Sequence, residues 1–170
     1  NPCATNSPQI VTVILYVLDN DRILNVPSEY PTIQAAINAA IGSGDTVIVV
    51  SGTYYENINF NGKNIVLTST DPTDPNVVAA TIIDGGGSGH VVTFATTQTS
   101  ACQLNGFTIT NGNANDPFPH LSGGGIYGNA SFATIANCKI TGNSAQSYGG
   151  GLHGIWGTIT NCTISGNSAV

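Results

Sequence analysis

The feature that most constrains the fold is a nine-residue motif that occurs twice near the end of the chain. Asn-Cys-Lys-Ile-Thr-Gly-Asn-Ser-Ala at residues 137–145 recurs as Asn-Cys-Thr-Ile-Ser-Gly-Asn-Ser-Ala at residues 161–169, an offset of 24 residues. A looser copy covers residues 106–114, and its Ile109 lies 31 residues before Ile140. Units of this length that contain short strands and no helical pattern of their own are typical of a β-solenoid.

In a solenoid, each turn of the chain lies about 4.8 Å from the next, and backbone groups bond to the turns on either side. Equivalent residues therefore stack, and an apolar pair of this kind faces the core. We expect two pairs that face the core, Ile140 with Ile164 and Cys138 with Cys162. Asn143 and Asn167 are expected to form an amide ladder at a turn. The alternation of apolar residues is interrupted near Asn137, which predicts a corner in the strand there.

The first half of the chain predicts less regular turns of the same kind. Strands are expected at residues 46–50, 64–68, 81–84 and 90–94, separated by Gly, Pro and Asp. Residues 32–41 are the one segment with helical periodicity. Its apolar face comprises Ile33, Ala36, Ile37, Ala40 and Ile41. A helix at this position is expected to cover one end of the solenoid core, as terminal caps do.

Residues 26–37, 44–47 and 51–58 resemble the opening of pectin-lyase-like right-handed β-helix proteins. The Gly-Gly-Gly-Ile and Asn-Cys-x-Ile-x-Gly-Asn units resemble repeats of the polymorphic outer membrane protein type, although Cys138 and Cys162 stand where those repeats usually have Phe. The resemblance covers about residues 23–170. We therefore expect an all-β fold, a right-handed parallel β-helix with an N-terminal amphipathic capping helix and an extra N-terminal strand.

Residues 1–22 lie outside the resemblance and are expected to form an N-terminal arm. Residues 10–18 are apolar on both faces of a strand, so both faces need a cover, and the run is too short to cross a bilayer as a helix. The strand either lies along its own β-helix or is donated to a neighbouring subunit. The expected assembly interface joins it to the last, uncapped turn: Ile10, Val11, Val13, Ile14, Leu15, Tyr16, Val17, Leu18, Ala169 and Val170.

Composition favours an exported protein. Charged side chains make up 7% of the chain, against about 25% in an ordinary domain. The net charge of −6 argues against binding to nucleic acid or to anionic membrane surfaces. Four cysteines in a chain without Met or a signal peptide predict an extracellular or cell-surface protein, secreted with its signal removed. The disulfides that the sequence allows are Cys138–Cys162, with free thiols as the alternative, and Cys3–Cys102.

The acidic residues do not form a recognisable catalytic set. Polysaccharide lyases and hydrolases need paired carboxylates or a base on one outward face, yet the two clearest repeats contain no acid and Arg22 is the single arginine. We expect no catalytic residue, no metal and no cofactor. Ca²⁺ at Asp19-Asn20-Asp21 or at Asp71-Pro72-Thr73-Asp74 is the alternative. Tyr148 and Trp156 are candidates for glycan contact, with packing as the alternative.

These observations favour a non-catalytic extracellular structural protein. Its subunits would self-assemble into a filament, sheath or cell-surface layer, joined by the N-terminal strand and the open C-terminal turn, so the expected partner is a second copy of the chain. Two alternatives stay open. One is a carbohydrate-binding or adhesin module for extracellular polysaccharide, and the other is a fragment of a polysaccharide lyase or hydrolase that uses Asp84.

Overall fold

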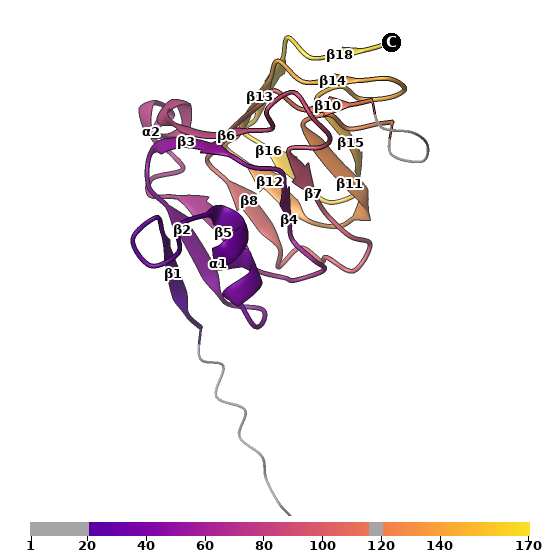
Figure 1. Cartoon of the computed structure of the whole chain (residues 1–170). Coiled ribbons are helices and arrows are strands. Elements are labelled where there is room, and N and C mark those ends of the chain that lie inside the picture. Colours follow the sequence, from indigo (N-terminus) through magenta and orange to yellow (C-terminus); the bar gives the residue numbers. More distant parts are fainter. Residues whose placement is uncertain (1–20, 116–120) are drawn as a thin grey trace, which may run out of the picture.

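The computed structural model describes residues 21–115 and 121–170 and consists mainly of short parallel strands arranged in four sheets (Figure 1). The six-stranded sheet contains, in spatial order, β1 (Ile23–Val26), β2 (Thr46–Val49), β5 (Val66–Ser69), β8 (Gln103–Asn105), β12 (Thr134–Ala136) and β16 (Ile159–Thr160). The five-stranded sheet contains β17 (Thr163–Ser165), β13 (Lys139–Thr141), β9 (Thr108–Thr110), β6 (Thr81–Asp84) and β3 (Gly52–Tyr55).

Two smaller sheets complete the coil. The four-stranded sheet contains β15 (Leu152–Ile155), β11 (Ile126–Ser131), β7 (Val92–Thr93) and β4 (Ile58–Asn59), and the three-stranded sheet contains β10 (Asn113–Ala114), β14 (Ser144–Ala145) and β18 (Ser168–Ala169). The chain visits the sheets in rotation, so that β12, β13, β14 and β15 are followed by β16, which lies beside β12. This is an all-β parallel solenoid, and the 24-residue offset of the motif corresponds to one circuit.

The register of the strands confirms the predicted stacking of isoleucines. Ile109 on β9 pairs with Ile140 on β13, and Ile140 pairs with Ile164 on β17. Ile109 and Ile140 are fully buried. One residue before these strands, the backbone N–H of Cys138 donates to Sγ of Cys162 at 3.4 Å, so the two cysteines also lie on adjacent turns.

The predicted amide ladder is also confirmed. Nδ2 of Asn143 donates to Oδ1 of Asn167 at 3.0 Å, and Oδ1 of Asn143 accepts from the N–H of Gly112 on the preceding turn at 2.8 Å. The corner expected at Asn137 is present, because this residue has a φ of 52°, a conformation that Asn adopts more readily than most residues. The glycine triplets lie where turns approach closely, since a Cβ at Gly124 would collide with the carbonyl oxygen of Ser144.

Three of the strands predicted in the first half are found, and one of them has the predicted ends. Residues 46–50 and 64–68 correspond to β2 and β5, and residues 81–84 to β6. The prediction of a strand over 90–94 was too long, because only β7 forms there. Val91 and Val92 are both buried, so the alternation of a regular strand is broken at this point. The short helix α2 (Pro75–Ala80) was missed, although its N-cap residue Asp74 followed by a proline is a helix-start signal.

Helix α1 (Ile33–Ala39) is shorter than the predicted helix at 32–41. Thr32 is the N-cap, and its Oγ1 accepts from the N–H of Ala35 at 3.1 Å. The helix contacts β1, β2 and β4 and covers the end of the coil opposite the C-terminus (Figure 1), as the sequence predicted. Ile41 was expected on the apolar face, and this was wrong: it is 79% exposed, because Ala40 is extended and the helix has already ended.

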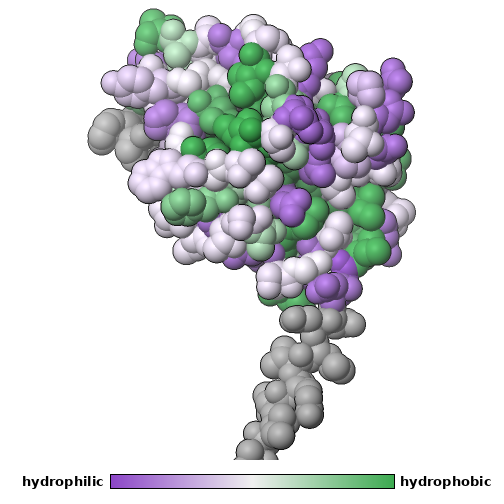
Figure 2. All heavy atoms as spheres, turned by 180° about the vertical axis from the view of Figure 1, so that it is seen from behind, coloured by the Kyte–Doolittle hydropathy of each residue, from purple (hydrophilic) through white to green (hydrophobic). Residues whose placement is uncertain are grey.

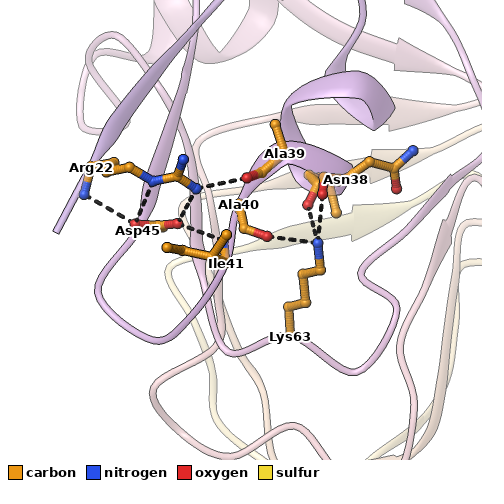
Figure 3. Close-up of polar contacts among 8 residues, drawn as sticks. Arg22, Asn38, Ala39, Ala40, Ile41, Asp45 and Lys63 are labelled. Atoms are coloured by element: carbon orange, nitrogen blue, oxygen red, sulfur yellow. Dashed lines mark hydrogen bonds and ion pairs between the residues drawn. The ribbon is translucent and has the colours of Figure 1, made fainter. Parts of the chain in front are cut away.

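Two basic residues from other parts of the chain satisfy the carbonyl groups at the end of α1 (Figure 3). Lys63 Nζ donates to three of them, at 2.7 to 2.9 Å: those of Ile37, Asn38 and Ala40. Arg22 donates to the carbonyl oxygen of Ala39 at 2.6 Å and to Asp45 at 2.9 Å. Carbonyls at a helix C-terminus have no partner within the helix, so these side chains replace the missing hydrogen bonds and hold the cap on the coil.

Replacing Lys63 by Met keeps most of the side-chain length and removes the ammonium group. We expect Lys63→Met to lower the free energy of unfolding by roughly 1.5–3 kcal/mol, the usual contribution of hydrogen bonds to a charged group. Urea denaturation measures the change. Lys139→Met is the control, because Lys139 is exposed and makes no side-chain hydrogen bond within the described residues. Equal losses in the two variants would contradict the role of Lys63 at the cap.

Asp45 makes the cap sensitive to acid. The hydrogen bond from Arg22 lowers the pKa of Asp45 to about 2, whereas an unfolded aspartate has a pKa of about 3.9. A carboxylate with a lowered pKa in the folded state stabilises the fold above about pH 4, and that contribution is lost as the pH falls towards 2. We therefore expect stability to fall more steeply between pH 4 and pH 2 in the wild type than in Asp45→Asn. Parallel curves of unfolding free energy against pH would contradict this.

Candidate functional site at the last turn

Among residues 21–115 and 121–170, none covers the core beyond the last turn of the coil. Strands β15, β16, β17 and β18 are the terminal strands of their sheets and lie together at the C-terminal end (Figure 1). Each has a strand neighbour on one side within the described residues. Ile135 and Ile140 on the preceding turn are fully buried, whereas their stacking partners Ile159 and Ile164 are 41% and 48% exposed. Inward-facing apolar side chains are therefore open to solvent at this end.

Polar backbone groups are also left without partners at the last turn. In the ladder, the N–H of Gly112 donates to Asn143 and the N–H of Asn143 donates to Asn167, each to the side-chain oxygen. The backbone N–H of Asn167 has no acceptor in the part of the chain that the structure describes. A strand edge beside an apolar surface is a template for a further strand, so this end is suited to strand addition.

Of the residues predicted to form the assembly interface, the structure describes Ala169 and Val170. Ala169 is exposed on β18 and Val170 is 99% exposed beside it. The remaining residues of the predicted interface lie outside the described residues: Ile10, Val11, Val13, Ile14, Leu15, Tyr16, Val17 and Leu18. On the rear face of the molecule, apolar residues lie in several patches with neutral and polar residues between them (Figure 2). The last turn differs from the preceding turn because its stacked isoleucines, Ile159 and Ile164, are exposed.

The two aromatic residues proposed as glycan contacts belong to two different ring groups. Tyr148 is 68% exposed and begins a row of stacked rings on the four-stranded sheet. The row is Tyr148, His153, Tyr127 and His90, with successive centroid separations of 6.1, 6.4 and 4.8 Å. Trp156 is 67% exposed and packs edge-on against Phe132 at 6.0 Å. Packing between turns accounts for both groups, and glycan contact stays a prediction.

The carboxylates considered for catalysis or Ca²⁺ binding hold local structure. Asp84 accepts hydrogen bonds from Asn111 and from the N–H of Gly86, both at 2.8 Å. Asp71 accepts from Thr73, and Asp74 caps α2. Within residues 21–115 and 121–170, no three His, Cys, Asp or Glu side chains are grouped so that they could hold a metal ion. Asp19 lies outside these ranges.

A groove of about 240 Å³ lies between α2 and the corner that precedes β13 and β17. Sequence reasoning missed it, because it depends on α2. The residues that line it are Pro72, Thr73, Pro75, Val78, Ala79, Asn137, Cys138, Lys139, Asn161 and Thr163. This lining has one amine and no carboxylate, which does not suit the acid–base chemistry of polysaccharide cleavage.

The structure does not contain the predicted disulfides at the described cysteines. Cys102, Cys138 and Cys162 are free thiols, and Cys3 lies outside the described residues. Sγ of Cys138 donates to the carbonyl oxygen of Ala136 at 3.1 Å, and Sγ of Cys162 donates to that of Thr160 at 3.2 Å. Each sulfur also donates to a carbonyl oxygen of the preceding turn, Cys138 to Leu104 at 3.8 Å and Cys162 to Ile135 at 3.6 Å. The two cysteines stack as predicted, but they are not bonded.

The described residues form an all-β parallel solenoid in which a helix covers one end of the core and none of these residues covers the other. No helix among the described residues is long and apolar enough to cross a membrane. Comparison with known protein families, with curated proteins and with solved structures found no match to the chain.

Proposed function

We propose that the chain is a non-catalytic extracellular structural protein, a right-handed parallel β-helix of the pectin-lyase-like type whose copies assemble end to end. The observation that carries the proposal is the uncovered last turn, where Ile159 and Ile164 are exposed although their stacking partners are fully buried. A neighbouring strand that continues the stack would bury this apolar surface and pair the open edge.

The right-handed sense is supported by the connections between parallel strands. A crossover between parallel strands of one sheet is right-handed in about 98% of cases, because of the twist of the strands. Each circuit of this coil is such a crossover, as in the path from β12 to β16. The resemblance of residues 26–58 to right-handed β-helix proteins supports the same hand.

The segment proposed to bind the last turn is residues 10–18 of another copy. This segment is rich in Val, Ile and Leu, residues that favour strands and that can cover Ile159 and Ile164. Pairing along the edge of β16 would add main-chain hydrogen bonds, as in other cases of strand addition. The two surfaces differ, so the contact is head-to-tail, and head-to-tail contacts that do not close form filaments.

The position of the covered end agrees with this arrangement. The arm joins the coil at Arg22, next to β1, and β1 and β16 are the opposite edges of the six-stranded sheet. Helix α1 covers the core at the β1 end. The core of another copy therefore could not pack directly against the core at this end. An arm that starts at one end and binds the other end of the next copy joins subunits along the coil axis.

The test is sedimentation velocity and negative-stain electron microscopy of the full chain over a range of concentrations. We expect concentration-dependent filaments. Deletion of residues 1–20 should abolish them, and Ile164→Lys should raise the required concentration at least tenfold, because a charge would replace the apolar contact. Val50→Lys is the matched control, since Val50 is also 48% exposed but lies away from the last turn.

Thermal unfolding of each variant confirms that the coil itself is intact. A wild-type chain that remains a monodisperse monomer at the highest concentration would overturn the proposal. So would filaments that are unchanged after deletion of residues 1–20.

A further inference from the structure

We propose that Cys138 and Cys162 are an oxidisable thiol pair whose disulfide fastens the uncovered last turn to the turn beside it. The inference rests on the stacking of the two turns and is independent of end-to-end assembly. It concerns a modification of the chain, with a small disulfide as the reagent.

The backbone is already arranged for this bond. Lys139 pairs with Thr163, and the N–H of Thr163 donates to the carbonyl oxygen of Cys138 at 2.9 Å. The two cysteines therefore occupy equivalent positions on adjacent turns, which are about 4.8 Å apart. A disulfide requires Cα atoms about 4.4–6.8 Å apart, so the bond needs side-chain rotation and no shift of the strands.

The cysteine side chains are also in contact across the turns. Sγ of Cys162 accepts from the N–H of Cys138 at 3.4 Å. Both thiols also donate to backbone carbonyl oxygens: Cys138 to those of Ala136 and Leu104, and Cys162 to those of Thr160 and Ile135. A thiol is a weak hydrogen-bond donor, so little is lost when either sulfur rotates towards the other.

The two thiols have different roles in the reaction. Cys162 lies on the last turn and is half-buried, whereas Cys138 is 2% exposed. The hydrogen-bonding thiol of Cys138 lowers the pKa of Cys162, and burial raises the pKa of Cys138 well above its ordinary value. The thiolate is the reactive form, so Cys162 attacks first and Cys138 follows.

The reaction is thiol–disulfide exchange with a low-molecular-weight disulfide. Cys162 loses its proton, and its sulfur attacks one sulfur of the reagent, breaking the reagent's S–S bond. One small thiol leaves with a proton, and a mixed disulfide remains on Cys162. Cys138 then loses its proton and attacks the Cys162 sulfur, which expels the second small thiol. Two protein thiols are oxidised to one disulfide, and one small disulfide is reduced to two thiols.

Cys102 provides an internal comparison. It is fully buried, and burial raises its pKa to about 12. Gln103 pairs with Thr134 on the next turn, so the residue that stacks on Cys102 there is Ala133 rather than another cysteine. Cys102 should therefore stay reduced under conditions that oxidise the pair.

The disulfide would act where the coil is least constrained. The last turn has exposed strands and is bonded to the rest of the coil from one side within the described residues. A bond between residues 138 and 162 closes a loop of one full circuit, and a covalent loop restricts the opened state of the segment. We expect oxidation to suppress local opening of residues 158–170.

The experiment uses the full chain with Cys3→Ser, which removes the cysteine outside the described residues. The protein is equilibrated with oxidised glutathione, blocked with an alkylating reagent and analysed by mass spectrometry. We expect an intramolecular product that has lost two hydrogens. Trypsin cleaves after Lys139 and so separates Cys138, in residues 64–139, from Cys162, in residues 140–170. The oxidised protein should give these two peptides joined.

Variants identify the partner of Cys162 and the effect of the bond. Cys138→Ser should abolish the joined peptides, and Cys102→Ala should retain them. Hydrogen exchange in residues 158–170 should be on the order of tenfold slower in the oxidised chain than in the reduced one, with no difference in Cys138→Ser. Free thiols at both positions after equilibration would overturn the inference. Linkage through Cys102, linkage only between chains, or unchanged exchange after oxidation would also overturn it.

Discussion

The structure depends on hydrogen bonds that run along the axis of the coil between equivalent residues of successive turns. No strand among the described residues exceeds six residues, and β4, β7 and β16 have two each. Strands this short cannot form a stable unit alone, so each turn is held by the turns on either side. In-register pairing also brings like residues together, which places Ile109, Ile140 and Ile164 in one ladder and Asn143 beside Asn167.

Because each turn is held by its neighbours, the two ends of the coil are the places where one neighbour is lacking within the described residues. At the β1 end, α1 covers the core. Lys63 and Arg22 bind the carbonyl groups at its C-terminal end, and Asp45 accepts from the backbone N–H of Ile41 just beyond it. At the other end, β16, β17 and β18 expose apolar and polar groups that are paired elsewhere in the coil. We propose two ways in which this exposure is reduced: end-to-end assembly with another copy, and a disulfide between the last two turns of the same chain.

Local sequence patterns predicted the parts of the fold that repeat. The motif around Cys138 and Cys162 predicted the register of β13 and β17, and the interrupted alternation predicted the corner at Asn137. Contacts between distant positions leave no such pattern in the sequence. The sequence therefore did not predict the hydrogen bonds from Lys63 to α1 or the groove beside α2. It also did not predict that the helix ends before Ile41. The stacking of Cys138 on Cys162 could be predicted in the same way. Whether the two form a disulfide or remain free thiols could not, because this depends on side-chain rotation and on the redox environment.

The most direct test of the account is a methyl–methyl nuclear Overhauser measurement on the chain with labelled isoleucine δ-methyl groups. The stacked register predicts contacts from Ile140 to both Ile109 and Ile164, and none between Ile109 and Ile164, which lie two turns apart. Absence of the Ile140–Ile164 contact in the folded chain, or a direct contact between Ile109 and Ile164, would contradict the coil on which every proposal above depends.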